Sequence, residues 1–423
     1  MNRRSGVLIA ALSLPILVIG MQSFTGKTVS AQALAGGQAP NFEVDPLWPK
    51  PLPNHWLLGS VTGVAVDAQD NVWIVHQGGA TLNARTEMGA ATTPPTAEGC
   101  CIPAPPVLKF DPAGNLVASW GSPADGVSWP RLPQGITVDS NNNVWIGGAA
   151  NGSIEGQQPA AAAAAPRGAA LRGRGAAQPQ PQDAHLLKFS AAGKLLLQIG
   201  SPGKVEGSES RTTLNLPAGA VVDAAANEVY VADGGVVRPA SGQPIYGNHR
   251  VVVFDANTGV YKRHWGAYGS KPEDTNAGPY DANAAPARQF RGVSCVRIAR
   301  DGMVYVCDRE NDRIQLFQKD GKFVKEGSVS RTTLGDGSAW DIAFSNDAQQ
   351  RFMYVADGHD KKVFILVRDS MEVVGSLGTG GRQPGQFFGV GSIAVDSKGN
   401  LYTGETYEGK RVQKFAYKGL RNR

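Results

Sequence analysis

One arrangement of apolar and polar positions recurs along the chain. Each copy has a short alternating stretch, which ends in Asp in the clearest copies, then a polar turn and a second apolar stretch centred on an aromatic residue. Alternation with a period of two predicts half-buried β-strands, and turns rich in Asn, Asp, Gly and Ser predict tight hairpins between them. The six copies begin at Val61, Leu132, Leu216, Arg291, Gly337 and Phe388.

A third apolar stretch follows the hairpin in every copy, and a final stretch ending in Gly comes after it. The third stretches are residues 107–111, 185–190, 249–255, 312–317, 361–367 and 410–415. Four antiparallel strands repeated around an axis form the blades of a β-propeller. The sequence therefore predicts an all-β fold, a six-bladed β-propeller over residues 42–419, with a linker at 32–41 before it and a tail at 420–423 after it.

The sixth copy is short of one strand. Its third strand is followed only by Lys418–Arg423, which are too few residues for a fourth strand. The segment Phe42–Trp48 precedes the first copy and has no other role in the repeat. We expect it to pair as the outer strand of the sixth blade, because an open ring would leave unpaired strand edges.

Residues 1–31 are typical of a signal peptide. Arg3 and Arg4 precede an apolar stretch at 7–21, and Val29-Ser30-Ala31 matches a small-x-small cleavage pattern. A retained anchor is the alternative, although the stretch is short for a membrane span. We expect a secreted or periplasmic protein with no membrane span after cleavage. Cleavage removes three basic residues and no acidic one, which lowers the formal net charge from +5 to +2. A charge this small does not indicate a nucleic-acid partner.

The chain contains four cysteines, too few for a disulfide scaffold in a protein of 423 residues. Cys295 and Cys307 fall opposite each other on neighbouring predicted strands, where a disulfide and two buried thiols are both open. Cys100 and Cys101 are adjacent in a predicted loop, where the alternatives are a vicinal bridge and a link to another chain.

The long insertions fall on one face of the predicted ring. Three of them, at 77–106, 147–184 and 234–248, join second to third strands, and the fourth, at 267–289, joins the third blade to the fourth. These connections open on the same face of a propeller, and repeat proteins tend to carry loop elaboration on their binding face. The insertion at 147–184 is rich in Ala and Pro and poor in large apolar residues, so we expect it to be disordered.

The repeat resembles the NHL repeat, and the chain after the leader resembles the peptidyl-α-hydroxyglycine α-amidating lyase domain of peptide-amidating enzymes. The matching segments are VTGVAVDAQDNVWIVHQGG (61–79), VADG (231–234), YGNHRVVVFD (246–255) and CDRENDRIQLF (307–317). The resemblance implies a six-bladed propeller with a zinc ion in its central channel, held by three His residues that open the inner strands of alternate blades. It also implies that an Arg and a Tyr from loops between second and third strands assist cleavage of the hydroxyglycine C–N bond.

The zinc positions of the family are not matched in this chain. The aligned residues are Gln134, Ser294 and Gly391, whereas zinc prefers His, Cys or carboxylate ligands. We therefore expect no metal and no other cofactor. The alternative is a relocated zinc ion held by histidines from three separate blades, which are His76, His249 and His359.

Two residues carry catalytic roles by resemblance. Arg309 aligns with the family Arg, and Tyr246 is matched to the family Tyr across the third insertion. A structural alternative for Arg309 is an ion pair with a neighbouring carboxylate in the repeat turn. The residues that we expect to bind ligand at the elaborated face are Gln134, His76, Gln77, Trp340, His359 and His249.

Two functions fit these observations. The first is a monomeric, non-enzymatic module that binds a peptide, glycan or protein at the inserted face, and the unmatched zinc positions favour it. The second is a diverged lyase-like enzyme with a relocated or absent metal, which the family resemblance and Arg309 favour. Because function depends on the site and not on the fold, we predict the binding module from the loss of metal ligands.

Overall fold

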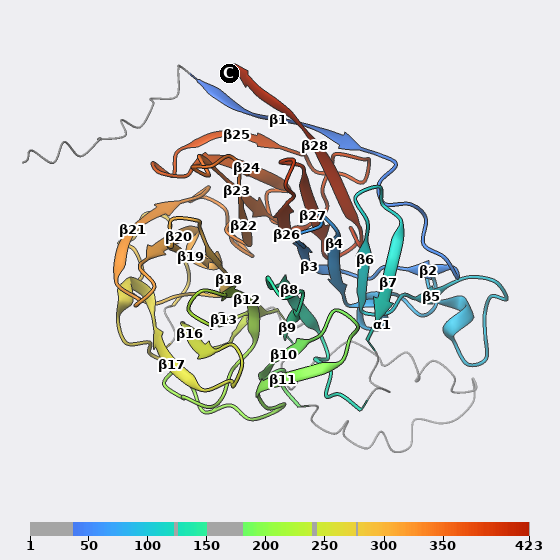
Figure 1. Cartoon of the computed structure of the whole chain (residues 1–423), viewed down its shortest axis with the longest axis horizontal. Coiled ribbons are helices and arrows are strands. Elements are labelled where there is room, and N and C mark those ends of the chain that lie inside the picture. The colour runs from blue at the N-terminus through green and yellow to red at the C-terminus, as the bar shows by residue number, and fades with distance from the viewer. Residues whose placement is uncertain (1–36, 122–125, 150–180, 239–242, 276–277, 423) are drawn as a thin grey trace, which may run out of the picture. The chain divides into compact units, whose positions relative to one another are not determined.

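The computed structural model describes residues 37–121, 126–149, 181–238, 243–275 and 278–422. Six four-stranded antiparallel sheets in this part of the chain are arranged around a central axis (Figure 1). The predicted all-β, six-bladed propeller is therefore confirmed. The predicted signal peptide and its cleavage site lie outside the described residues, as do residues 150–180 of the Ala/Pro-rich insertion.

The four strands of each blade follow one another from the axis outward. Blades 1 to 3 are β3 (Val61–Val66), β4 (Val72–His76), β6 (Val107–Phe110) and β7 (Leu116–Trp120); β8 (Pro133–Val138), β9 (Val144–Gly148), β10 (His185–Phe189) and β11 (Leu195–Gly200); β12 (Pro217–Asp223), β13 (Glu228–Asp233), β16 (Arg250–Asp255) and β17 (Tyr261–Trp265). Blades 4 to 6 are β18 (Val293–Ile298), β19 (Val304–Asp308), β20 (Arg313–Phe317) and β21 (Phe323–Ser328); β22 (Asp341–Phe344), β23 (Phe352–Asp357), β24 (Lys362–Val367) and β25 (Val373–Leu377); β26 (Val390–Val395), β27 (Leu401–Glu405), β28 (Val412–Asn422) and β1 (Gln38–Asp45).

The second strand of each blade carries a buried aromatic residue at its second or third position, and this residue explains the recurring sequence pattern. These residues are Trp73, Trp145, Tyr230, Tyr305, Tyr354 and Tyr402. The Trp73 indole donates a hydrogen bond to Asp67, the residue that ends the preceding alternating stretch (3.0 Å). Trp145 and Tyr402 make the same bond to Asp139 and Asp396. The Asp thus gives a hydrogen-bond partner to the polar atom of the aromatic side chain, which would otherwise be buried without one.

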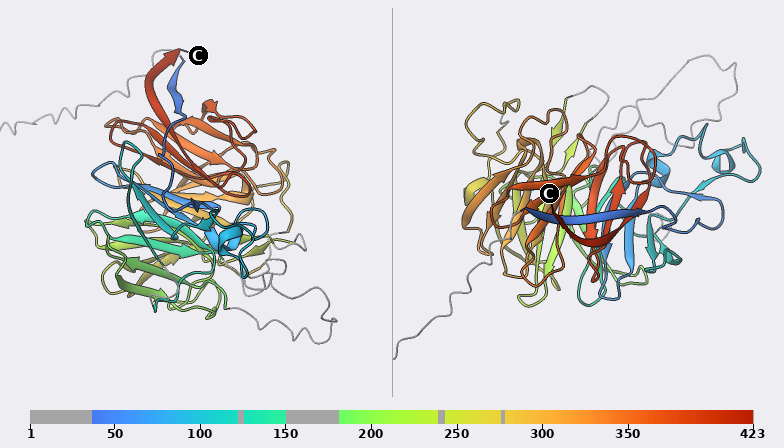
Figure 2. Two further views of the ribbon diagram at one scale, coloured as in Figure 1. Left: turned by 90° about the vertical axis from the view of Figure 1, so that its right-hand side faces the viewer. Right: turned by 90° about the horizontal axis from the view of Figure 1, so that it is seen from above.

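The N-terminal strand closes the ring, as predicted. β1 pairs antiparallel with β28, from Gln38 opposite Asn422 to Asp45 opposite Lys414. The bounds differ from the expected ones, because the third strand of blade 6 continues to Asn422 and gives β1 a longer partner. Residues 38–41 and 420–422, expected as linker and tail, therefore lie in strands. Figure 2 shows the paired ends of β1 and β28 projecting together from the ring.

Trp48 is not part of this closing strand. It is buried between blades 1 and 6, where its ring centroid lies 5.8 Å from that of Phe110 and 5.0 Å from that of Tyr402. The segment that follows β1 therefore joins blades 1 and 6 through side-chain packing, while β1 completes blade 6 by main-chain pairing with β28.

All four cysteines form disulfides. Cys295 and Cys307 are register partners on β18 and β19 and are bonded to each other, and Cys100 is bonded to Cys101. In the structure both pairs are thus bonded within the chain, whereas the sequence left two buried thiols and a link to another chain open as alternatives.

The described parts of the insertions contain short elements of their own. After β4 come α1 (Gly78–Thr81), the 3-10 turn η1 (Gly89–Ala91) and β5 (Ile102–Pro103), which pairs with β2 (Trp56–Leu57). Figure 2 shows this insertion in light blue at the side of the ring. In the third insertion β14 (Val236–Val237) pairs with β15 (Ile245–Tyr246), and the fourth begins with the 3-10 turn η4 (Ala267–Gly269). Another described 3-10 turn, η5 (Arg309–Asn311), joins β19 to β20. In the part of the chain that is described, no helix has the length and hydropathy needed to cross a membrane.

Candidate functional site at the channel mouth

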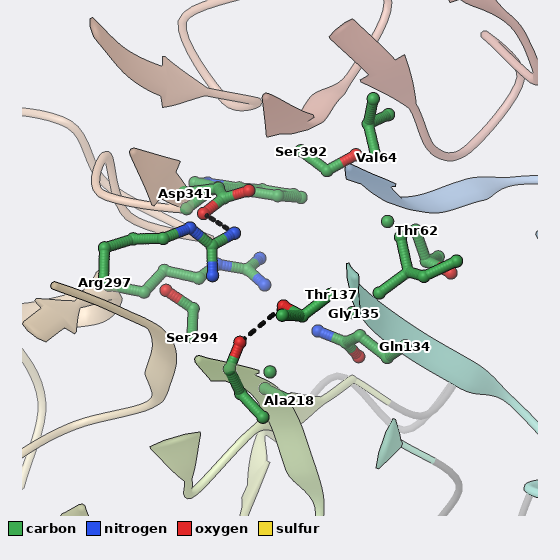
Figure 3. A pocket seen from close by; sticks show the side chains of 17 residues that line it. Thr62, Val64, Gln134, Gly135, Thr137, Ala218, Ser294, Arg297, Asp341 and Ser392 are labelled. Atoms are coloured by element: carbon green, nitrogen blue, oxygen red, sulfur yellow. Dashed lines mark hydrogen bonds and ion pairs between the residues drawn. The ribbon is translucent and has the colours of Figure 1, made fainter. Parts of the chain in front are cut away.

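The inner strands of all six blades line a pocket on the propeller axis (Figure 3). Its polar side chains come from β3, β8, β18, β22 and β26 and from Arg309 in the turn after β19, and the glycines and alanines of β8 and β12 leave space between them. The side chains that matter for its chemistry are those of Thr62, Gln134, Thr137, Ser294, Arg297, Arg309, Trp340, Asp341 and Ser392.

The three positions aligned with the family's zinc ligands all lie in this channel. Gln134 points its carboxamide into the pocket (Figure 3), and no hydrogen bond holds that group among the described residues. The Ser294 hydroxyl donates to the carbonyl of Ala339 (2.9 Å). Gly391 has no side chain, and a Cβ placed there would lie 3.4 Å from the Trp340 ring. The three aligned positions therefore lie in one pocket, although none of them carries a His.

This donor set does not fit zinc. One carboxamide and one hydroxyl already bonded to a carbonyl replace three imidazoles. The deeper carboxylate, that of Asp341, is bonded to Arg297 (2.6 Å) and accepts the N–H of Ile393 (3.1 Å). Within the described ranges, no three or more His, Cys, Asp and Glu side chains gather as metal ligands. The guanidinium groups of Arg297 and Arg309 in the lining also disfavour a cation.

Other hydroxyls in the lining bind one blade to the next. Thr62 on β3 donates to the carbonyl of Pro133 on β8 (2.7 Å), and Thr137 on β8 donates to that of Ala220 on β12 (2.6 Å). Gln77 adds a bond from its amide to Pro133 (3.2 Å). These side chains fix the width of the channel at the positions where the inner strands approach each other.

A wider pocket opens the channel on the elaborated face. It is lined by loops that follow second strands, together with the connection between blades 4 and 5, and with the solvent open to it measures about 790 Å³. We call it the channel mouth. Its lining side chains are those of Val61, Thr62, Gln77, Leu132, Gln134, Ala149, Val236, Val237, Arg238, Arg309, Asp336, Trp340, Thr406 and Tyr407.

Arg309 lies in the mouth with its guanidinium over the Trp340 ring, 3.5 Å from the ring centroid. Its Nε donates to the main-chain carbonyl of Asp336 (2.6 Å), and its Nη2 lies 3.9 Å from the Asp336 carboxylate. The carboxylate partner thus comes from the connection between blades 4 and 5, whereas the expected alternative placed it in the repeat turn of Arg309 itself. Cation–π stacking and this ion pair hold the guanidinium plane in one orientation.

Asp336 joins two arginines and a tyrosine at the mouth. It forms ion pairs with Arg309 and with Arg238, and the Tyr407 hydroxyl donates to it (2.5 Å). Burial works against its negative charge, but the charge of Arg309, the Tyr407 bond and the charge of Arg238 outweigh it and hold the pKa of Asp336 below its ordinary value. The carboxylate is therefore ionised at neutral pH.

Tyr407 is the tyrosine of the mouth. Desolvation of its hydroxyl and the charge of Asp336 raise the pKa of Tyr407 to about 12, against the opposing charge of Arg309. Tyr246 lies in neither pocket lining: its hydroxyl donates to Glu310, which also accepts a bond from Arg238 (2.7 Å). Burial and this carboxylate raise the pKa of Tyr246 as well. Both hydroxyls therefore stay protonated at neutral pH.

The three histidines are not brought together. His76 is fully buried, accepts the N–H of Gly59 (3.1 Å) and bonds the carbonyl of Pro105 (2.9 Å), and burial lowers its pKa to about 4. His249 is buried and bonds the carbonyl of Phe290 (2.7 Å). Both rings brace loops and lie in neither pocket lining. His359 is exposed and covers Gly335, beside the mouth.

Of the residues expected to bind ligand, Gln134, Gln77 and Trp340 line the mouth together with Arg309. Arg238, Asp336 and Tyr407 also line it and were not among the residues predicted from the sequence. Tyr407 follows a second strand just as Arg309 does, so its position in the repeat was the signal that could have found it. Arg238 and Asp336 lie in an insertion and in a connection between blades, where the repeat gives no position.

The comparisons with known proteins agree with the resemblance seen in the repeat. The chain is similar in sequence to peptide-amidating enzymes. It is 25% identical over 271 residues to peptidyl-glycine alpha-amidating monooxygenases A and B of Xenopus laevis, a match over 64% of this chain and over 22% and 24% of the two relatives. It thus spans less than a quarter of their length. No family model matches the chain. A solved structure of streptogramin B lyase superposes with a TM-score of 0.44 at 10% identity, over 90% of this chain and 98% of that one.

Proposed function

We propose that the chain is an exported binding module that takes a peptide, glycan or protein ligand into the channel mouth. The observation that carries the proposal is the stack of Arg309 on Trp340, close to the Gln134 carboxamide that no described protein group engages. A guanidinium fixed in its plane and a free carboxamide offer N–H donors that suit carbonyl or carboxylate oxygens. A peptide supplies these oxygens at regular spacing, so a peptide is the ligand that we favour.

The titration behaviour of the mouth supports binding over proton transfer. A general base works best with a pKa near the working pH. Tyr407 stays protonated, and Asp336 is an anion neutralised by Arg238 and Arg309. The arrangement is one of paired charges that hold side chains still, which is what a preformed binding site requires.

A lyase-like activity is the second candidate. The 25% identity to the amidating monooxygenases favours it, as does the placing of a tyrosine hydroxyl and Arg309 around the same carboxylate. The channel residues do not fit the zinc ion that the family resemblance implies, so this candidate requires cleavage without that metal.

Export is part of the same proposal. Both disulfides favour an oxidising compartment outside the cytosol, since bonds of this kind are rare where thiols are kept reduced.

The test is retention of peptides by the folded protein. A mixed peptide library, with free or amidated C-termini, is incubated with the protein, and the retained peptides are identified by native mass spectrometry. We expect retention that Arg309→Gln abolishes and Arg300→Gln leaves unchanged, because Arg300 is an exposed arginine of the same blade bonded to Asn346 and Asp347. A protein that retains no peptide, and no glycan on an array, lacks the proposed function. Turnover of a hydroxyglycine-extended peptide would instead establish the second candidate.

A further inference from the structure

Three blades contain a buried ion pair between the end of their second strand and the start of their third. Asp233 pairs with Arg250 in blade 3 (2.8 Å), Asp308 with Arg313 in blade 4 (2.7 Å), and Glu405 with Arg411 in blade 6 (2.5 Å). The three carboxylates are fully buried. The arginine therefore supplies the charge without which such burial is costly.

Blade 5 keeps the carboxylate and lacks the arginine. Asp357 faces Lys362 in the strand register, as Asp308 faces Arg313 and Asp233 faces Arg250. Asp357 is fully buried, and its Oδ1 accepts the N–H groups of His359 (3.0 Å) and Asp360 (2.8 Å). Its Oδ2 is buried and has no hydrogen-bond partner in the described structure.

A second carboxylate in the same condition lies at the neighbouring blade. Asp312 is fully buried, its Oδ1 accepts the N–H of Ser338 (2.8 Å), and its Oδ2 has no hydrogen-bond partner among the described residues. The hydroxyl of nearby Tyr280 donates to the carbonyl of Arg331 (2.9 Å) and, together with Ser338, lowers the pKa of Asp312 without outweighing burial. Each of the two carboxylates thus has one buried oxygen without a hydrogen-bond partner among the described residues, although most buried polar atoms are paired.

Charged groups of both signs surround this pair. Lys362 stands opposite Asp357 in the strand register but forms no ion pair among the described residues, and the nearby acidic groups add negative charge. Asp360 acts on both carboxyls, Asp312 acts on Asp357, and Tyr280 and His359 are the other titratable neighbours. Burial, the largest cause, raises the pKa of Asp312 to about 7 and that of Asp357 to about 7, and the charge of Asp360 adds to both rises.

The two blades hold between them the connection at 329–338, which carries Asp336. The N–H of Val329 donates to the carbonyl of Asp312 (2.9 Å), and Ser338 bonds its carboxylate. The hydroxyls of Ser330 and Thr333 donate to Asp360 (2.9 and 3.1 Å). The carboxyl groups between blades 4 and 5 thus anchor the connection whose Asp336 binds Arg309 and Arg238 in the channel mouth.

We propose that Asp312 and Asp357 form a proton-operated switch that regulates the channel mouth. With protons on the pair, blades 4 and 5 pack around neutral carboxyl groups, and the 329–338 connection holds Asp336 against the two arginines. When the protons leave, two buried negative charges between the blades repel each other, and the connection loosens. Ligand affinity then falls as the pH rises through neutrality. This last consequence rests on the proposed binding function, whereas the switch itself does not.

The experiment measures hydrogen exchange of the 329–338 amides at pH 6 and pH 8.5, corrected for intrinsic exchange rates. In the wild type we expect protection to fall by about tenfold or more at the higher pH, a local opening effect. Asp312→Asn combined with Asp357→Asn keeps the shape without the charge, and its protection should stay constant. Asp320→Asn, an exposed acid on the opposite side of blade 4, serves as the control and should behave as the wild type.

The readout needs no ligand, so failure of the switch and failure of the binding function are separate results. Wild-type protection that does not change between the two pH values overturns the switch. A loss of protection at pH 8.5 that the double variant retains overturns it also, because the two carboxylates then do not cause that loss. If the double variant folds poorly by circular dichroism, the wild-type pH dependence and Asp357→Asn alone still decide the question.

Discussion

The guanidinium of Arg309 lies over the indole ring of Trp340, 3.5 Å from the ring centroid, where the central channel opens. The two side chains come from different blades, since Arg309 follows β19 and Trp340 precedes β22. Their contact therefore joins blades 4 and 5 at the place where we propose that ligand binds.

Replacing Arg309 with Lys keeps the charge and removes the planar stack. We expect Arg309→Lys to weaken binding of a retained peptide by about tenfold, which corresponds to about 1.4 kcal/mol. Isothermal titration with that peptide measures the change, with Arg300→Lys as the matched control. If Arg309→Lys binds the peptide with unchanged affinity, the positive charge alone binds the ligand and the planar shape of the guanidinium is not needed.

Replacing Asp357 with Asn alters how stability depends on pH. The pKa of this carboxyl is raised in the folded state to about 7, so the folded protein binds the proton more tightly than the unfolded chain. Its contribution to stability is complete below the ordinary pKa of an Asp, declines as the pH rises toward 7, and is lost above it. We expect Asp357→Asn to be more stable than the wild type at pH 8 and to lose less stability between pH 5 and pH 8 in urea denaturation. A variant that is less stable at pH 8 shows that the ionised form has a favourable partner.

Removing the disulfide between β18 and β19 lowers stability through the unfolded state. Cys295 and Cys307 are separated by 12 positions, a loop for which the chain-entropy model gives about 3 kcal/mol. We expect Cys295→Ala with Cys307→Ala to lower the free energy of unfolding by about 2–3 kcal/mol in denaturant titration. The disulfide between the adjacent residues Cys100 and Cys101 closes no comparable loop, so replacing both with Ala should change the free energy of unfolding little.

Phe42 tests the closure of the ring. Its ring packs edge-on against Tyr354 of blade 5 (5.4 Å between centroids) and against Tyr417 of β28 (5.8 Å). The side chain is half-buried, so Phe42→Ala should cost about 2 kcal/mol, roughly half the cost at a fully buried position. In Phe42→Ala, hydrogen exchange should rise in β1 and β28 before any other strand. Equal protection across all six blades would contradict the closure of the ring by this strand pair.

The architecture was predictable because it depends on repetition. Alternation in each copy, the Asp that meets a buried aromatic residue and the missing strand of the sixth copy all reflect local physics that the sequence carries. The bounds of the closing strand were less predictable, because the length of β28 depends on its pairing with β1 and not on its own apolar pattern.

The site was predictable only where the repeat carries it. Gln134, Gln77, Trp340 and Arg309 occupy repeat positions that point to the axis, and all four line the mouth. His76 sits one position before Gln77, yet its ring is taken up by Gly59 and Pro105 inside the fold. His76 and Gln77 differ in the direction of their side chains at the end of β4. The alternation of apolar residues does not reveal that direction at the end of a strand.

The pairing of β1 with β28 has a consequence for biosynthesis. Gln38 donates a side-chain hydrogen bond to Asn422 across 384 positions of the sequence. A strand that emerges early from the ribosome therefore waits for one that emerges much later, and the circle cannot be completed until β28 has been made. A product truncated before β28 leaves β1 without its partner and exposes the open edge of β27. Only translation through β28 therefore covers this edge, which is otherwise open to pairing with other chains.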